Sequence, residues 1–311
     1  YIELGGKFYL NALGRLALES GDPVVGNVAS GVEGIYYGID GETSVRYTAP
    51  FILAGGIRTL SFTAKDNVAN AEVVKSTAIY VDGAKPVSEL SISGDQYLGD
   101  KVYVSLRSVI VLTAADPVVS EVASGVRETI YSLDGGAFAN YAAFKLASEG
   151  KRLVSFYSAD RVGNVEVTKT SELWLDATAP DTALSITGAR HDADGLIYIT
   201  KDSGIVLTSA DPVSNETASG VLLTKYRIDD GPWQVYAGSV TITAEGRHTL
   251  EYYSLDRVLN TEALKTAALF VDNTPPVTAI TLGEPKFEAF GLTVLTPDAP
   301  ITLSAEDAAS G

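Results

Sequence analysis

The sequence lacks cysteine and methionine entirely, and among its 311 residues it has two histidines and two tryptophans. Without cysteine, disulfides, thiolate metal sites and thiol nucleophiles are all excluded. The sequence also has no secretion signal pattern and no run of 18 apolar residues, so no membrane insertion is expected in this segment.

Basic residues are scarce as well. The chain has 39 Asp and Glu against 23 Lys and Arg, which gives a formal net charge of −16. A surface of that sign repels a phosphate backbone and an anionic lipid surface. Nucleic acid is therefore excluded as an expected partner.

Catalytic constellations are also missing. His191 and His248 are the only histidines, no Ser or Asp arrangement recurs around them, and there is no G-x-S-x-G motif. Carboxylate pairs could in principle hydrolyse glycosides, but an active site is singular, whereas the notable acids here come in threefold copies. We expect that the chain is not an enzyme.

The chain is instead filled with internal repeats. DPVVGNVASG at 22–31 returns as DPVVSEVASG at 116–125 and as DPVSNETASG at 211–220, and ASG occurs again at 309–311. The Ala of ASG stands at 29, 123, 218 and 309, so the offsets are 94, 95 and 91 residues. This phase predicts four repeats, the last one partial, with bounds 1–83, 84–177, 178–273 and 274–311.

Within a repeat the pattern is that of β-strands. Leu60–Ala64, Leu153–Ser158 and Thr249–Ser254 are short, rich in aromatic and β-branched residues, and bounded by turn signals. No stretch keeps an apolar 3.6-residue period long enough for a helix. About seven short strands fit into each repeat, and this predicts an all-β fold of tandem immunoglobulin-like sandwiches in an elongated array.

The ordered motifs ASGV, Y-S-x-D-G-G and S-x-D-x-x-G-N-x-E, preceded by D-x-T-x-P, are best kept in 84–177 and 178–273. This set resembles the bacterial Ig-like repeats of large secreted and cell-surface proteins, including the outer-membrane-adhesin-type Ig-like repeat. The resemblance covers essentially the whole chain, and repeat one departs from it at YGIDGETS and AKDNVAN. It implies a sandwich architecture and an extracellular spacer or adhesive role, and it implies no catalytic residue.

The ASG loops could hold Ca²⁺, which prefers several carboxylate and carbonyl oxygens. The first loop position is always Asp, and the sixth always carries an oxygen ligand. An Ig-like topology brings these loops to the same end as a second acidic turn and the preceding linker carboxylate. The candidate ligands are Asp82, Asp116, Glu121 and Asp160 in one set, and Asp176, Asp211, Glu216 and Asp256 in the other.

A purely structural interpretation competes with the calcium hypothesis. The loops can be turns between the second and third strands of each repeat, in which Asx-type hydrogen bonds satisfy the backbone donors. Asp160 with Asn164, or Asp256 with Asn260, can be hairpin residues that tolerate left-handed geometry. The twelve-residue EF-hand loop is absent. Gathered carboxylates repel one another unless a cation neutralises them, which favours either calcium or separation.

Aromatic residues offer one further candidate site. Phe138 and Trp233 occupy equivalent positions, with Ser44 in repeat one, and could form a platform for stacking sugars or could simply pack. Tyr47, Tyr141 and Tyr236 recur in phase and are expected in the core.

The sequence therefore predicts an extracellular or cell-surface structural or adhesive protein that forms a rod, stalk or fibre. The alternative is a spacer or carbohydrate-binding region of a larger secreted polysaccharide-active enzyme. Expected partners are neighbouring repeats, other copies in a fibre, or a surface glycan or protein. We also expect short, extended, proline-containing linkers, and a chain that is an excerpt of a longer array.

Overall fold

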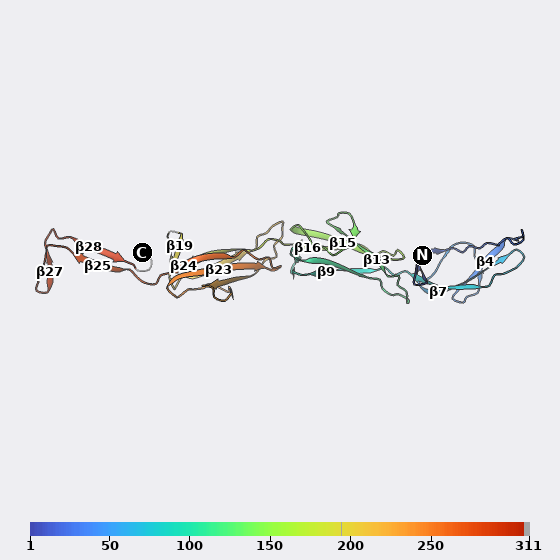
Figure 1. Ribbon diagram of the computed structural model, residues 1–311, viewed down its shortest axis with the longest axis horizontal. Coiled ribbons are helices and arrows are strands. Elements are labelled where there is room, and N and C mark those ends of the chain that lie inside the picture. Colours follow the sequence, from blue (N-terminus) through green and yellow to red (C-terminus); the bar gives the residue numbers. More distant parts are fainter. Residues whose placement is uncertain (194, 308–311) are drawn as a thin grey trace. The chain divides into compact units, whose positions relative to one another are not determined.

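The computed structural model describes residues 1–193 and 195–307, and the ASG at 309–311 lies outside them. Throughout this described part, the regular elements are β-strands and none is a helix (Figure 1). No helix there is long and apolar enough to cross a bilayer. The predicted all-β class with tandem sandwich repeats is confirmed.

The chain forms two compact units, Tyr1–Leu175 and Asp176–Gly311, and each is described by itself. The first contains repeats one and two, and the second contains repeats three and four. The second unit begins at Asp176, two residues before the boundary expected from the repeats. The bounds of the four repeats stay a prediction.

Repeat two is built on a six-stranded sheet. One pair, β11 with β16, is parallel, and the other pairs are antiparallel. The strand order is β10 (Gln96–Leu98), β11 (Val102–Val104), β16 (Lys169–Leu175), β15 (Gly150–Asp160), β13 (Val126–Leu133) and β14 (Ala139–Asn140).

Repeats one and three have the same sheet order. In repeat one it is β1 (Ile2–Leu4), β2 (Lys7–Asn11), β8 (Lys75–Asp82), β7 (Gly56–Asp66), β4 (Val32–Ile39) and β5 (Val45–Arg46). In repeat three it is β18 (Arg190–Ala193), β19 (Leu196–Ile199), β24 (Lys265–Val271), β23 (Gly246–Asp256), β21 (Val221–Ile228) and β22 (Gln234–Val235). The strands expected from the aromatic segments lie in β7, β15 and β23.

A second, smaller layer covers the six-stranded sheet in repeats two and three. It pairs β9 (Val87–Ser93) with β12 (Val109–Ala115), and β17 (Asp181–Thr187) with β20 (Gly204–Ala210). Their alternating apolar side chains close two cores, one around Val104, Ile110 and Leu175 and the other around Ile205 and Leu250. In β9, Leu90 and Ile92 face the large sheet whereas Glu89 and Ser91 face water, as period-two alternation requires.

The ASG loop lies one hairpin later than expected. It connects β20 to β21, the fourth and fifth strands of repeat three, and not the second and third. The difference arises because β18 and β19 form a hairpin before β20, and β19 adds to the large sheet by pairing in parallel with β24.

Two of the three phased tyrosines pack against a core as expected. Tyr141 and Tyr236 contact the cores of repeats two and three. Each stands edge-on to the tyrosine of the preceding strand, with ring centroids 6.2 Å apart for Tyr131 and Tyr141 and for Tyr226 and Tyr236. This is a favourable geometry for aromatic pairs.

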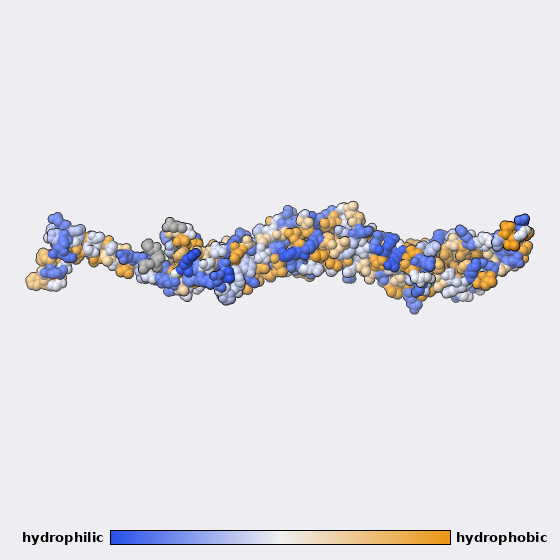
Figure 2. Space-filling view, in the orientation of Figure 1, coloured by the Kyte–Doolittle hydropathy of each residue, from blue (hydrophilic) through white to orange (hydrophobic). Residues whose placement is uncertain are grey.

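The described residues of repeat four form two strand pairs. β25 (Val277–Leu282) pairs with β28 (Ile301–Glu306), and β26 (Lys286–Ala289) pairs with β27 (Leu292–Leu295). Their apolar side chains remain at the surface: Ile301 is 58% and Leu303 75% exposed. Figure 2 shows apolar surface over β27.

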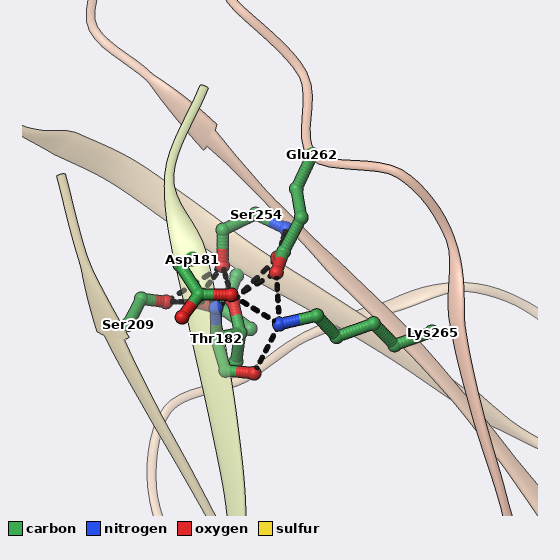
Figure 3. Close-up of polar contacts among 7 residues, drawn as sticks. Asp181, Thr182, Ser209, Ser254, Glu262 and Lys265 are labelled. Atoms are coloured by element: carbon green, nitrogen blue, oxygen red, sulfur yellow. Dashed lines mark hydrogen bonds and ion pairs between the residues drawn. The ribbon is translucent and has the colours of Figure 1, made fainter. Parts of the chain in front are cut away.

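A buried glutamate ties the two layers of repeat three together (Figure 3). Glu262 accepts the N–H of Thr182 at 2.7 Å and that of Ser254 at 2.9 Å, and it lies 2.7 Å from the Lys265 ammonium. Burial raises the pKa of Glu262, but hydrogen bonds from Lys265 and Thr182 outweigh it and hold the pKa below its usual value.

We predict unequal costs for removing equivalent glutamates. Glu262→Ala should lower the free energy of unfolding of repeat three by about 3 kcal/mol, because it leaves buried donors and a lysine without their carboxylate. Glu72→Ala, at a side chain that is 35% exposed, should cost less than about 1 kcal/mol. Denaturant titration followed by tryptophan fluorescence and by circular dichroism measures both. Equal costs would contradict the role assigned to Glu262.

His248 takes the place that arginine holds in the other repeats. Its Nδ1 lies 2.6 Å from Asp229 Oδ2 and its Nε2 lies 2.9 Å from the Ala244 carbonyl. Arg152 makes the corresponding contacts, donating to Asp134 at 3.0 Å and to the Ser148 carbonyl at 2.8 Å. Burial lowers the pKa of His248, but these acceptors outweigh it and raise the pKa above 6.5.

Repeat three should therefore lose stability on mild alkalinisation. A raised folded-state pKa means that the stabilisation is full below about pH 6.5 and disappears as the pH rises through the folded-state value. Thermal melts at pH 6 and pH 8, together with an NMR titration of the ring, measure the effect. His248→Arg should remove this dependence, and a ring that titrates below pH 6.5 would overturn the assignment.

Candidate functional site

The ASG loops are built on a tight two-residue turn. Val119 and Val122 exchange backbone hydrogen bonds at 3.0 Å in each direction. The residues between them, Ser120 and Glu121, have φ of 50° and 64°. Two successive positive φ values are the signature of a type I′ hairpin turn. Asn215 and Glu216, with φ of 47° and 60°, repeat this geometry between Ser214 and Thr217.

This turn places Glu121 and Glu216 away from the other expected ligands. Their side chains are exposed, and in the described part of the chain neither belongs to a group of acids close enough to share a metal ion. The recurring oxygen-bearing residue at the sixth loop position thus occupies a solvent-facing turn. Among the described residues, this position lies outside both groups of acids that could share an ion.

The first loop residue, in contrast, closes the loop. Asp116 Oδ2 accepts the N–H of Gly125 at 2.7 Å, and Asp211 Oδ2 accepts that of Gly220 at 2.6 Å. Gly125 has φ of 86°, which a glycine adopts without strain. The first and last residues of the motif therefore form one structural element.

Three aspartates meet beside the ASG loop in repeat two and again in repeat three. The first trio is Asp82, Asp116 and Asp160, and the second is Asp176, Asp211 and Asp256. In each trio one carboxylate oxygen per residue lies within 4.8 Å of the others. These are six of the eight expected ligands.

The members of the first trio come from distant parts of the sequence. Asp82 ends β8 of repeat one, Asp116 follows β12, and Asp160 ends β15. Asp82 and Asp160 are buried, at 1% and 0% exposure, and Asp116 is partly exposed. The strand ends fix the carboxylates, so the group is held by the two sandwiches and not by a flexible loop.

Hydrogen bonds occupy most of the carboxylate oxygens. Asp160 accepts the N–H groups of Val162 and Asn164 at 3.0 and 2.7 Å, which is the turn geometry foreseen for this pair. Asp82 Oδ2 accepts the Ser124 N–H at 2.7 Å. Asp116 Oδ1 is buried and accepts no hydrogen bond from the described residues.

The electrostatics of the trios are unfavourable in the absence of a cation. Burial, together with the charges of Asp82 and Asp160, raises the pKa of Asp116 against the hydrogen bond from Gly125. In the second trio, burial and then the Asp176 charge raise the pKa of Asp256 to about 6 against the hydrogen bonds from Asn260. At the spacing of the trios, two carboxylates repel by about 3 kcal/mol at an effective dielectric near 20.

The donor set fits a hard cation. Both trios offer only carboxylate oxygens, with no nitrogen or sulfur ligand, and Ca²⁺ takes such ligands together with carbonyls and waters. The buried Asp116 Oδ1 is the oxygen that an ion would satisfy. Zn²⁺ favours His and Cys, which the trios do not contain.

The two asparagines have a role that the sequence did not reveal. Asn164 donates through Nδ2 to the Asp82 carbonyl at 3.1 Å, and Asn11 of repeat one donates to Asn164 Oδ1 at 2.6 Å. Asn260 donates likewise to the Asp176 carbonyl at 3.0 Å. The recurrence of Asn in phase, at 70, 164 and 260, was the signal that could have indicated this contact.

The structural role of three phased glutamates was also missed. Glu72, Glu166 and Glu262 recur in phase, and each is followed three residues later by lysine. In repeats two and three, this Glu-x-x-Lys pair joins the two layers of the sandwich. Reading the sequence for metal ligands does not reveal that role.

The aromatic candidates pack against a neighbouring ring and remain half exposed. Phe138 lies 5.3 Å from Tyr157, and Trp233 lies 4.9 Å from Tyr253, both edge-on. The Arg227 guanidinium stands 4.9 Å from the Trp233 ring centroid. One face of Trp233 is thus engaged by the protein itself.

Known proteins offer limited likeness. No protein-family profile and no curated protein sequence matches the chain. Fibronectin(III)-like modules of Clostridium thermocellum CbhA share 15% identity at a TM-score of 0.31, over 55% of this chain and 90% of theirs.

Two further solved structures illustrate the range of the likeness. A structure of a 1.5-MDa bacterial ice-binding adhesin shares 13% identity at a TM-score of 0.34, over 86% of this chain and 95% of that one. The glucan-locus protein SGBP-B of Bacteroides ovatus shares 12% identity at 0.19, over 89% and 69%. At these values the likeness carries no conclusion about what this chain binds.

We predict that neutralising one carboxylate stabilises the metal-free protein. In EDTA, Asp116→Asn should raise the free energy of unfolding by about 2 kcal/mol, because it removes like-charge repulsion and its carbonyl oxygen can still accept the Gly125 N–H. Asp22→Asn is the matched control. Asp22 accepts the Gly31 N–H at 2.8 Å in the same way but belongs to no trio among the described residues.

Denaturant titration of both variants measures this difference. A loss of stability in Asp116→Asn equal to that in Asp22→Asn would show that the first trio is not electrostatically strained.

Proposed function

We propose that the chain is a non-catalytic, extracellular structural or adhesive repeat protein, and that Ca²⁺ bound by the aspartate trios stabilises its repeats. The observation that carries the proposal is the gathering of three buried or half-buried carboxylates beside the ASG loops of repeats two and three. Such a group costs stability without a cation and gains it with one.

The first trio combines aspartates from two successive repeats. Asp82 belongs to the last strand of repeat one, whereas Asp116 and Asp160 belong to repeat two. A cation held by all three would bind only when the end of one repeat is seated on the loops of the next. Calcium would thereby stiffen the joint within the first unit, as a rod or stalk requires.

The same repetition supports the proposal that the chain is non-catalytic. The acids recur in every repeat, and His248 is engaged by Asp229 and a backbone carbonyl. We expect no hydrolytic activity, and we expect the partners to be further repeats of the same kind or a surface glycan or protein.

A second function is favoured by the exposed aromatics. Phe138 and Trp233 are 47% and 38% exposed and occupy equivalent hairpins. Half-exposed rings of this kind can stack on sugars, as in a carbohydrate-binding region attached to a secreted polysaccharide-active enzyme. A glycan array separates the two functions, since a structural rod binds no glycan through these rings.

We predict that calcium raises the melting temperature of the native chain. A hundredfold excess over Kd stabilises a protein by about 2.7 kcal/mol, which corresponds to a shift of several degrees at this size. Thermal melts in EDTA, in millimolar calcium and in millimolar magnesium measure it. Magnesium should shift the melt less, because it demands octahedral geometry and retains its waters.

The variants described above provide the controls. Asp116→Asn should reduce the calcium shift of the first unit, and Asp22→Asn should leave it intact. Superimposable melts with and without calcium would leave the loops as turns and refute the ion site.

A further inference from the structure

The first and last strands of a complete repeat lie in different layers of its sandwich. Repeat two begins with β9 at Val87 and ends with β16 at Leu175. β9 belongs to the two-stranded layer, and β16 belongs to the six-stranded sheet. The chain therefore enters the repeat through one layer and leaves it through the other.

The entry and the exit also lie at opposite ends of the repeat. The last residue of β9, Ser93, pairs with Val109 at the start of β12. A tight turn joins the start of β12 to the end of β11, whose Val104 pairs in parallel with Leu175. Leu175 therefore lies at the end that β9 reaches, and the length of β9 separates it from Val87.

Tension along the chain would load both strands in shear. A pull on Val87 slides β9 along β12, and an opposite pull on Leu175 slides β16 along β15. The hydrogen bonds of an antiparallel ladder lie perpendicular to its strands, so in this geometry they stretch together and do not open one by one. Resistance to sliding then depends on what holds each strand along its own axis.

Apolar packing and a single ladder hold most of β9. Among the described residues, its strand partner is β12 alone. Leu90 and Ile92 pack against the core, but apolar packing is non-directional and resists a sliding motion less than a directional polar contact does. A polar contact across the two layers would therefore contribute strongly to the resistance.

Ser88, the second residue of β9, makes such a contact with each of its polar groups. Its N–H donates to Glu166 at 3.1 Å, and its hydroxyl donates to the same carboxylate. Its carbonyl accepts a hydrogen bond from Lys169, the first residue of β16. Glu166 is itself fixed to β15, because it accepts the Ser158 N–H at 2.8 Å. The start of β9 is thus tied to β15 and β16 of the opposite layer.

Repeat three repeats this arrangement with threonine (Figure 3). Thr182 donates to Glu262 through its N–H at 2.7 Å and through its hydroxyl at 2.6 Å, and its carbonyl accepts from Lys265 at 2.7 Å. The Glu262 side chain is 5% exposed. At such burial the hydrogen bonds are stronger than in water, and few water molecules can replace them as they stretch.

We propose that these two contacts, Ser88 with Glu166 and Lys169, and Thr182 with Glu262 and Lys265, are mechanical clamps that set the force at which repeats two and three unfold. Each clamp grips the second residue of the first strand, where tension enters the repeat, and transfers the load to the large sheet before the strand slides. The inference rests on the structural function proposed above, since a rod or stalk carries tension along its chain.

The test is single-molecule force spectroscopy of the full chain, held at its two ends in EDTA. Forced unfolding is governed by the unfolding rate. Glu166→Gln keeps the shape of the side chain but removes its charge, and it should raise the unfolding rate of one repeat at constant force about tenfold. Glu166→Gln combined with Glu262→Gln should raise the rates of two repeats.

Substitutions of Ser88 provide the matched controls. Ser88→Thr introduces the residue that repeat three uses and should keep the original unfolding rate. Ser88→Ala removes the hydroxyl and should raise the rate about fivefold. Circular dichroism verifies that all variants are folded before they are pulled. Equal rates for Ser88→Thr and Ser88→Ala would overturn the proposal.

A core variant separates mechanical strength from stability. Leu146 is buried in the core of repeat two but belongs to no strand, so Leu146→Ala lowers stability without touching the clamp. An interaction that is broken in the transition state changes the unfolding rate by its full equilibrium effect, and one that persists there changes it less. For Glu166→Gln, the change in the logarithm of the rate under force should match the change in the logarithm of the equilibrium constant from denaturant titration. For Leu146→Ala it should be smaller.

A proportion for Glu166→Gln that is no larger than that for Leu146→Ala would refute the clamp. Neither calcium nor a surface ligand enters this measurement, so its failure would leave the calcium-dependent joint untouched. Conversely, a chain whose melting temperature ignores calcium can still show the clamp.

Discussion

The covering of one face of a six-stranded sheet by a two-stranded layer is the constraint on which each repeat depends. A single sheet exposes its apolar face, and a few strands in water are not stable alone. Repeat two meets this requirement through Leu90, Ile92, Ile110 and Leu112, all directed at the same core. Repeat four lacks the large sheet among its described residues, and its apolar side chains therefore stay at the surface.

The same constraint explains where polar groups are buried. Once β9 and β17 lie over the sheet, the first N–H groups of these strands are removed from water and need an acceptor. Glu166 and Glu262 provide it, at 9% and 8% exposure. The carboxylates remain charged inside the protein because a lysine three residues later and several donors surround each of them.

Much of the fold and of the aspartate groups could be predicted from the sequence, because each motif occurs in three repeats. The phase of the repeats located the strands, the acidic loops and the approach of Asp82 to Asp116 and Asp160, since an Ig-like topology brings these ends together. The hairpin β18–β19 was not foreseen, because its segment varies between repeats. The exposed position of Glu121 was not foreseen, because the sequence does not state that its backbone adopts a positive φ and turns the side chain toward water.

The hydrogen bonds between Ser88 and Glu166 also affect the order in which a repeat folds. They join residues 78 positions apart, and the contact between Thr182 and Glu262 joins residues 80 positions apart. A layer held by such distant partners closes only after nearly the whole repeat has been synthesised, and loop closure of that length opposes it until the final contacts form. During its synthesis each repeat is therefore an open sheet with free edges. In that interval a strand from the preceding or following repeat can compete for the place that its own first strand will occupy. The divergence of the loops and hairpins between repeats, which leaves the glutamate and lysine unchanged, reduces the number of strands that can pair in the wrong register.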